Sequence, residues 1–289
     1  MKNSQILSQL YAFTTVLLWS TAYVFTKISL QYFSTASLGL LRCAIASIVL
    51  MGIVVIKKMQ PPGKKCLPLF ILSGATGFTL YIMAFNIGSS LLNATTSCVI
   101  ISTSPIITAV LATVIFKEKL NARQWLATGL AFCGIIIIAL WDSHFSVSAG
   151  LVWMLGAAAL ISIYNILQRG LSRLYSAMQI TAYSFSFGTL MLMGFLPETA
   201  EQLHSAPQSQ IWLVCFLGIF PSAAAYAFWG KALALAPQTS SVTNYMFLTP
   251  FLALILEYIV MGTLPGRSTF IGGGVILSGL FLFTAAKEK

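Results

Sequence analysis

The chain has 289 residues, of which 58% are hydrophobic and only 8% are charged. A soluble globular domain cannot keep so much apolar surface out of water, so the composition excludes that class and indicates an integral membrane protein. The formal net charge of +10 would suggest nucleic acid as the partner of a soluble domain. Here the basic residues stand in short loops between apolar runs, where they orient the spans, so the lipid bilayer is the expected partner and nucleic acid is not.

Apolar runs of about 20 residues, long enough to cross a bilayer as helices, follow one another along the whole chain. The first five are expected near 9–29, 34–56, 66–88, 92–116 and 122–141. The second five are expected near 149–170, 176–196, 210–234, 238–262 and 268–286. The pattern predicts an all-α integral membrane protein with ten transmembrane helices, divided into one five-helix unit at 1–141 and a second at 149–286.

The basic residues predict the orientation of these spans. With ten spans and the N-terminus inside, 13 of the 16 Lys and Arg residues fall in cytoplasmic segments. The outer loops then hold Asp142, His144, Glu198, Glu201 and His204, with Arg267 as the only clear basic residue there. Because cytoplasmic loops carry the excess of Lys and Arg, we expect a multi-pass protein of the plasma (inner) membrane with both termini cytoplasmic.

A degenerate repeat links the two halves. The stretch from Tyr81 to Gly134 returns from Tyr226 to Gly279, and every marker moves by the same 145 positions. The markers are Tyr81 and Tyr226, Pro105 and Pro250, Gly129 and Gly274, and Gly134 and Gly279. Five crossings end on the opposite side from their start, so the two halves are expected to be inverted repeats. The glycines of the fifth and tenth spans predict close helix packing.

Several segments resemble one family in their order and spacing. They are WSTAYVFTK (Trp19 to Lys27), Arg42, SPIITAVLATVIFKEKLNARQ (Ser104 to Gln124), PSAAAYAFWGKAL (Pro221 to Leu233) and TPFLALILE (Thr249 to Glu257). Over nearly the whole chain they resemble the drug/metabolite transporter superfamily, EamA type. The resemblance implies a ten-helix exporter of small metabolites with a central cavity between inverted halves. One departure is that Glu118, 13 residues after the first proline, is matched by Thr263 in the second half.

Two ionisable residues lie inside expected spans, Arg42 in the second and Glu257 in the ninth. A charge at membrane depth costs several kcal/mol, so it marks a pathway or a partner. The two side chains are expected either to form a structural ion pair or to face a water-filled cavity. Glu257 is the candidate ion-coupling residue, and the proton is the candidate ion.

Pro105 and Pro250 each remove a backbone hydrogen bond midway through a span. One interpretation is a simple helix kink. The other is that the two kinked helices, related by the repeat, open a cavity at the midplane and act in gating.

Helical spacing places aromatic and neutral polar side chains on shared faces. Such stripes also occur as packing faces or as interfacial belts, which is the alternative interpretation. As a set they suggest a cavity with aromatic walls. The candidate substrate-binding residues are Trp19, Tyr23, Arg42, Tyr81, Ser104, Asn165, Tyr226, Trp229 and Asn244.

The chain has no phosphate-cradling glycine loop and no HExxH motif, so we expect no catalytic residues, no metal, no cofactor and no use of ATP. The function favoured is a secondary transporter with a small-molecule substrate, an exporter of amphipathic metabolites such as amino acids, working by alternating access. The alternatives are a transporter of cationic drugs, or of sugar phosphates and nucleotide sugars, which would need at least two deep cations. An integral membrane enzyme and a non-transporting membrane subunit rank behind these.

Overall fold

The computed structural model describes residues 2–117, 119–140, 148–235, 242 and 244–285. Helices joined by short turns and loops make up this part of the chain, and no β-strand occurs in it. Six helical stretches are long and apolar enough to cross a membrane: Thr35–Ile56, Lys64–Leu91, Ala94–Ile115, Ala149–Leu171, Ala177–Ser205 and Gln208–Leu235. Three shorter apolar helices are Ala122–Ile138, Tyr245–Met261 and Arg267–Phe283. The all-α prediction is confirmed, whereas the number of ten crossings stays a prediction.

The first half begins with two uninterrupted helices, α1 (Lys2–Ser29) and α2 (Thr35–Ile56). The next stretch is built from η1 (Lys64–Cys66), α3 (Leu67–Gly74), η2 (Ala75–Thr79) and α4 (Leu80–Leu91). After it come α5 (Ala94–Ile101), α6 (Ser104–Ile115) and α7 (Ala122–Leu140). Ser34 caps α2, its hydroxyl accepting from the Ser37 amide at 3.1 Å, so a short polar residue starts the span.

The second half starts with α8 (Ala149–Leu171) and α9 (Ala177–Leu192), which continues through η3 (Met193–Phe195) into α10 (Leu196–Ser205). It goes on with α11 (Gln208–Leu217), η4 (Gly218–Ala224), α12 (Ala225–Leu235), η5 (Asn244–Phe247), α14 (Leu248–Met261) and α15 (Arg267–Ala285). The expected seventh span ended at 196, but the helix runs on to Ser205, because Pro197 stands in the first turn of α10, where a proline costs no hydrogen bond.

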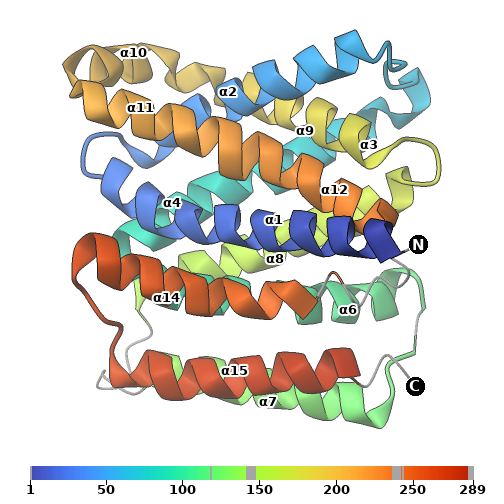
Figure 1. Ribbon diagram of the computed structural model, residues 1–289, viewed down its shortest axis with the longest axis vertical. Helices are drawn as coiled ribbons and strands as arrows, with labels where there is room; N and C mark the ends of the chain where they lie inside the picture. The colour runs from blue at the N-terminus through green and yellow to red at the C-terminus, as the bar shows by residue number, and fades with distance from the viewer. Residues whose placement is uncertain (1, 118, 141–147, 236–241, 243, 286–289) are drawn as a thin grey trace.

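The helix α1 lies at the centre of the bundle, beside α12 and α14 (Figure 1). Hydroxyl groups along α1 donate to carbonyl oxygens of its neighbours: Ser8 to Ala232 at 2.8 Å, Thr15 to Ala225 at 3.3 Å and Ser20 to Thr249 at 3.1 Å. Residue numbers fall along α12 as they rise along α1, so these two helices are antiparallel. Short polar side chains on α1 thus join its backbone to the backbones of α12 and α14.

The helices α7 and α15 form an antiparallel pair at one edge of the bundle (Figure 1). A Cβ added to Gly134 would meet the Gly272 carbonyl at 2.5 Å, and one added to Gly279 would meet the Ala127 carbonyl at 2.8 Å. These glycines therefore allow the backbones of α7 and α15 to pack closely, as predicted for the glycines of the fifth and tenth spans. For Gly129 and Gly274 the packing prediction is wrong, because a Cβ at either position would find nothing within 4 Å.

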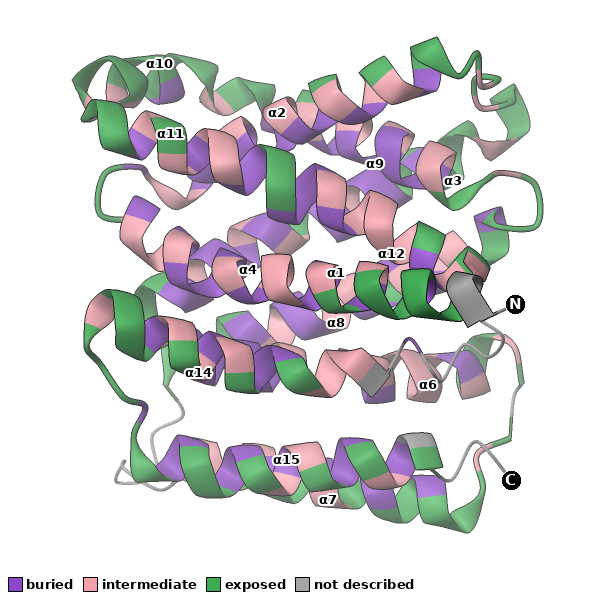
Figure 2. Cartoon of the chain, in the orientation of Figure 1, coloured by how far each residue is buried: buried purple, intermediate pink, exposed green. Residues whose placement is uncertain are grey.

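The outer surface of the bundle is apolar. Buried residues gather on the inward faces of the central helices, and exposed ones lie on the outer faces (Figure 2). Large hydrophobic side chains on those outer faces include Ile48 at 74% exposure, Phe132 at 64% and Phe281 at 66%. Exposure of such a surface to water is unfavourable, whereas lipid chains solvate it, as expected for helices that span a bilayer.

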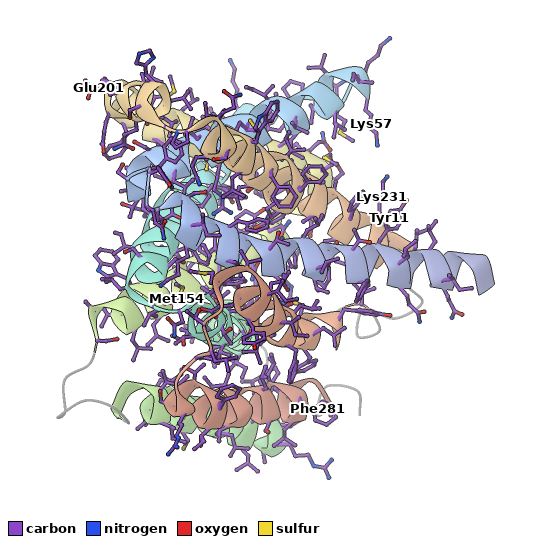
Figure 3. All side chains as sticks on the ribbon, turned by 60° about the vertical axis from the view of Figure 1, so that its left-hand side comes forward. Tyr11, Lys57, Met154, Glu201, Lys231 and Phe281 are labelled. Carbon is purple, nitrogen blue, oxygen red and sulfur yellow. The ribbon has the colours of Figure 1, made fainter. Side chains whose placement is uncertain are left out.

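Labelled charged side chains at the two ends of the bundle differ in sign, although Arg267, which begins α15, adds a basic residue to the acidic end. Figure 3 shows Lys57 and Lys231 at one end and Glu201 at the opposite end. Lys231 lies over the ring of Tyr11, with its Nζ 5.4 Å from the ring centroid. The helix α1 begins, and α15 ends, at the end that carries the two lysines (Figure 1).

Candidate functional site

A central cavity of about 910 Å³ lies between the two halves of the chain. Its wall takes residues from both halves: from α1, α2, η2, α4, α5 and α6 in the first, and from α8, α9, η4, α12, η5, α14 and α15 in the second. Most candidate residues share this wall: Trp19, Tyr23, Arg42, Tyr81, Ser104, Asn165, Tyr226 and Trp229, together with Pro105. Their roles in binding stay predictions.

Three candidates are not among the described wall residues. The side chain of Asn244 is outside the described part of the structure, although its backbone begins η5. Pro250 is buried in the first turn of α14, where its neighbour Thr249 reaches the wall. Glu257 is fully buried at 0% exposure, away from the described wall of the cavity. Only one of the two prolines therefore borders the cavity.

Aromatic rings form much of the wall. The Trp19 ring centroid lies 5.7 Å from that of Tyr226 and 5.2 Å from that of Trp229. Phe78 joins this group, with its ring centroid 6.1 Å from that of Tyr226. On the other side Tyr23 meets Phe85 edge to face, at 5.4 Å. Rings at these separations hold one another rigidly and present faces and edges to the cavity.

Arg42 is the charged group deep in this cavity, and its side chain is only 7% exposed. Its Nη1 donates to the Thr26 hydroxyl at 2.9 Å, and its Nη2 to the Ser222 hydroxyl at 3.5 Å. Its Nε, although buried, has no hydrogen-bond partner. Both hydroxyls are neutral, and no Asp or Glu of the described residues pairs with the guanidinium.

The pairing of Arg42 with Glu257, one of the two expected arrangements, is not what the structure shows. The Glu257 carboxylate accepts from the backbone amides of Ala94 at 3.1 Å and Thr95 at 2.8 Å, and from the Thr95 hydroxyl at 2.6 Å. It caps the first turn of α5, where free amides and the helix dipole stabilise a negative charge. This explains how a buried carboxylate is held without Arg42.

Lys27 contacts the same turn from the other side. Its Nζ donates to the carbonyls of Ser89, at 3.4 Å, and Leu92, at the end of α4. Lys27 also lies within electrostatic reach of Glu257. We call Lys27, Glu257 and the α4–α5 turn (91–95) the turn clamp. It ties α1 and α14 to the end of the bundle opposite to the one where α1 begins.

The described wall of the cavity is exposed to solvent at one end. Among its described wall residues, Arg169, Ser172 and Ala177 are the exposed ones, and all three lie where α8 ends and α9 begins. At the other end an apolar cluster fills the space; its buried members are Ala22, Phe33, Leu38, Val214 and Leu217. The turn clamp lies at that closed end too. The cavity is therefore a blind pocket with Arg42 toward its closed end.

A model of the EamA-like transporter family matches residues 6–140 and again residues 148–285. The chain belongs to the EamA-like transporter family. The two matches cover nearly the whole sequence, one in each half, and they make the protein a multi-pass membrane transporter with a small-molecule substrate. The resemblance inferred from the motifs is thereby confirmed.

Named relatives of this EamA-like transporter are transporters as well. It is 29% identical over 269 residues to an uncharacterized transporter, YdfC, of Bacillus subtilis, covering 91% of this chain and 86% of the relative. It is 27% identical over 268 residues to a probable terminal-alkyne amino-acid exporter of Streptantibioticus cattleyicolor, covering 93% and 90%. A crystal structure with 17% identity matches 97% of this chain and 98% of its own, with a TM-score of 0.65, which supports the fold alone.

Sequence reasoning missed two π-helical turns in this EamA-like transporter. They are η2 (Ala75–Thr79) and η4 (Gly218–Ala224), and each directly precedes the helix that carries Tyr81 or Tyr226. With the 145-residue offset, 75–79 falls on 220–224, inside η4. Such turns interrupt regular helix pairing and occur often at functional sites. Pro221 inside η4 was the available signal, since a proline in a helix interior removes an amide donor.

The fourth expected span is interrupted next to its proline. The helix is interrupted at Ser102 and Thr103, between α5 and α6, and Pro105 lies in the first turn of α6. The Ser102 and Thr103 hydroxyls donate to the carbonyls of Cys98 and Ile100, at 2.8 Å and 2.7 Å. Ser162 donates to the Ser104 carbonyl at 2.9 Å. Short hydroxyls thus satisfy backbone oxygens at a broken helix beside the cavity.

Proposed function

We propose that this EamA-like transporter is a secondary carrier that exports small amphipathic metabolites, such as amino acids, by alternating access around the central cavity. The observation that carries the proposal is the blind pocket, with an aromatic wall and Arg42 deep inside. A pocket open at one end is what one state of an alternating-access cycle requires. Aromatic rings with a few polar groups suit a partly apolar molecule.

We further propose ten crossings in two inverted five-helix repeats, at 1–141 and 149–286, with both termini in the cytoplasm. The antiparallel pairing of α7 with α15 supports inversion, because these helices end the two halves. Lys57 and Lys231 at one end and Glu201 at the other support the orientation (Figure 3). The open end of the pocket then faces the cytoplasm, where an exporter loads its substrate.

Amino acids are favoured over the other substrate classes for two reasons. One relative is named as a probable amino-acid exporter. Phosphorylated sugars and nucleotide sugars call for at least two deep cations, whereas the second arginine of the wall, Arg169, lies at the exposed mouth. A cationic drug would meet Arg42 with no carboxylate on the described wall to balance its charge.

The test is flux in proteoliposomes that contain the purified full-length chain. Vesicles preloaded with radiolabelled amino acids are expected to release them in a saturable way, and empty liposomes serve as the control. Runs with and without a proton gradient measure coupling to protons. Saturable exchange of nucleotide sugars or sugar phosphates, with no amino-acid flux, would contradict the proposal.

A further inference from the structure

We infer that Arg42 is a carboxylate anchor, so that the substrate is an amphipathic carboxylate whose charged end lies between α1, α2 and η4. The inference rests on the proposed transport through this cavity and deepens it, by naming the group that the deep end of the pocket recognises. It also sets how the substrate lies: the carboxylate toward the closed end and the apolar part toward the mouth.

The charge balance of the pocket is the first step of the argument. The charged residues on its described wall are Arg42 and Arg169, and no Asp or Glu is among them. Arg169 lies at the exposed mouth, with its guanidinium 4.8 Å from the centre of the Phe116 ring. Arg42 is buried, and a buried charge without a counter-charge is costly. An anion brought by the substrate supplies that counter-charge.

The hydrogen-bond geometry is the second step. A guanidinium carries five N–H donors in a planar fork, and a carboxylate accepts two of them side by side. Thr26 and Ser222 each accept from one Nη atom, so each Nη keeps a second N–H, while the buried Nε has no partner. A carboxylate in the pocket can accept from the two Nη atoms, one oxygen on each. A phosphate monoester would bring a further negative charge with no second deep cation to meet it.

The rest of the pocket gives the other end of the substrate. Tyr81 and Tyr226 lie within electrostatic reach of Arg42. From Tyr226 the aromatic wall continues through Trp19 and Trp229, and Trp229 is on α12 near the open end. An apolar side chain therefore contacts rings while its carboxylate reaches Arg42. This is a molecule with an acid at one end and a hydrocarbon or aromatic body.

The experiment compares acids with their methyl esters on the purified full-length protein. The standard L-amino acids are screened by thermal shift and by intrinsic tryptophan fluorescence, because Trp19 and Trp229 line the pocket. Each amino acid that binds is then tested as its methyl ester, which removes the negative charge, adds only one methyl group and keeps the amino group. The ester is expected to bind about tenfold more weakly or worse, since it loses a charge-assisted pair.

Substitutions of Arg42 test whether the preference for the acid over its methyl ester depends on this residue. Arg42→Gln is expected to weaken binding of the acid about tenfold and to leave binding of the ester unchanged, so the preference disappears. Arg42→Lys keeps the charge without the fork and is expected to retain part of the preference. Arg173→Gln, on an exposed arginine off the described wall, is the matched control and should behave as wild type. If Arg42→Gln does not fold, the wild-type protein and Arg42→Lys still decide the question.

The outcomes separate this inference from the proposed function. Equal binding of acid and ester by the wild-type protein, or equal loss of both in Arg42→Gln, overturns the anchor while leaving amino-acid transport standing. Absence of amino-acid binding, with saturable transport of a sugar phosphate, overturns both. A preference for the decarboxylated amine over the amino acid would also overturn the anchor and would favour a cation.

Discussion

At Glu257 a buried carboxylate is held by the start of a helix near one end of the bundle. Three hydrogen bonds from Ala94 and Thr95 reach its two oxygens, and the side chain is completely buried. The sequence could show that Glu257 lies inside a span, but not what it contacts, because its partners are backbone amides 162 and 163 residues away. Two roles follow for this residue, a structural cap and an ion-coupling group, and one substitution separates them.

We expect Glu257→Gln to lower the unfolding temperature of the purified protein. The amide nitrogen of glutamine would face a backbone donor, and the loss of a buried, charge-assisted bond costs about 1–3 kcal/mol. Differential scanning fluorimetry measures the shift, and Glu201→Gln on exposed α10 is the control. Unchanged stability with loss of the proton dependence of flux would instead assign Glu257 to coupling.

Trp19 and Tyr226 meet across the pocket, one from each half of the chain. We expect Trp19→Ala or Tyr226→Ala to weaken export, because either change removes a wall that an apolar substrate contacts. Growth of expressing cells on toxic amino-acid analogues measures this as reduced resistance. Trp212→Ala removes a tryptophan that is 67% exposed on α11 and should leave resistance unchanged. Resistance that survives both cavity substitutions at normal protein abundance would contradict the aromatic site.

Among the elements, α7 and α15 depend on contact between backbones. We expect Gly134→Ala to destabilise the protein by about 1–3 kcal/mol, because the new Cβ would lie 2.5 Å from the Gly272 carbonyl. Gly129→Ala on the same helix is the control, since nothing lies within 4 Å of its Cβ. Thermal unfolding in detergent compares the two. Equal stability of both variants would show that α7 can move away from α15 without cost.

The elements also show what a sequence can predict here. Length and apolar character located the helical stretches, and helical spacing indicated faces such as that of Trp19 and Tyr23, because both signals are local. The π-helical turns η2 and η4 and the break at Ser102 and Thr103 depend on which helix lies opposite, as where Gly77 faces the ring of Tyr164. Spacing within one helix cannot reveal that. Thr26 was overlooked for the same reason, although it follows Tyr23 by one helical turn.

For the whole molecule, the proposed orientation places the two ends of the bundle in different compartments. In a cysteine-free background, Ser205→Cys is expected to react with an impermeant maleimide added outside intact cells. Lys64→Cys is expected to react only after the membrane is permeabilised. Both positions are exposed, so access to the reagent depends on the side of the membrane. The reverse labelling pattern would invert the orientation and turn the open pocket toward the outside.

The glycine crossing of α7 and α15 also bears on ancestry. Gly134 faces Gly272 while Gly279 faces Ala127 and Ala131, so the end helices of the two halves meet as two copies would meet about a twofold axis. A single ancestral gene whose product inserted in both directions could have formed this contact before duplication joined its copies. Residues 1–147 and 148–289, expressed as separate polypeptides, are therefore expected to copurify and to restore export, and Gly134→Ala should weaken their association.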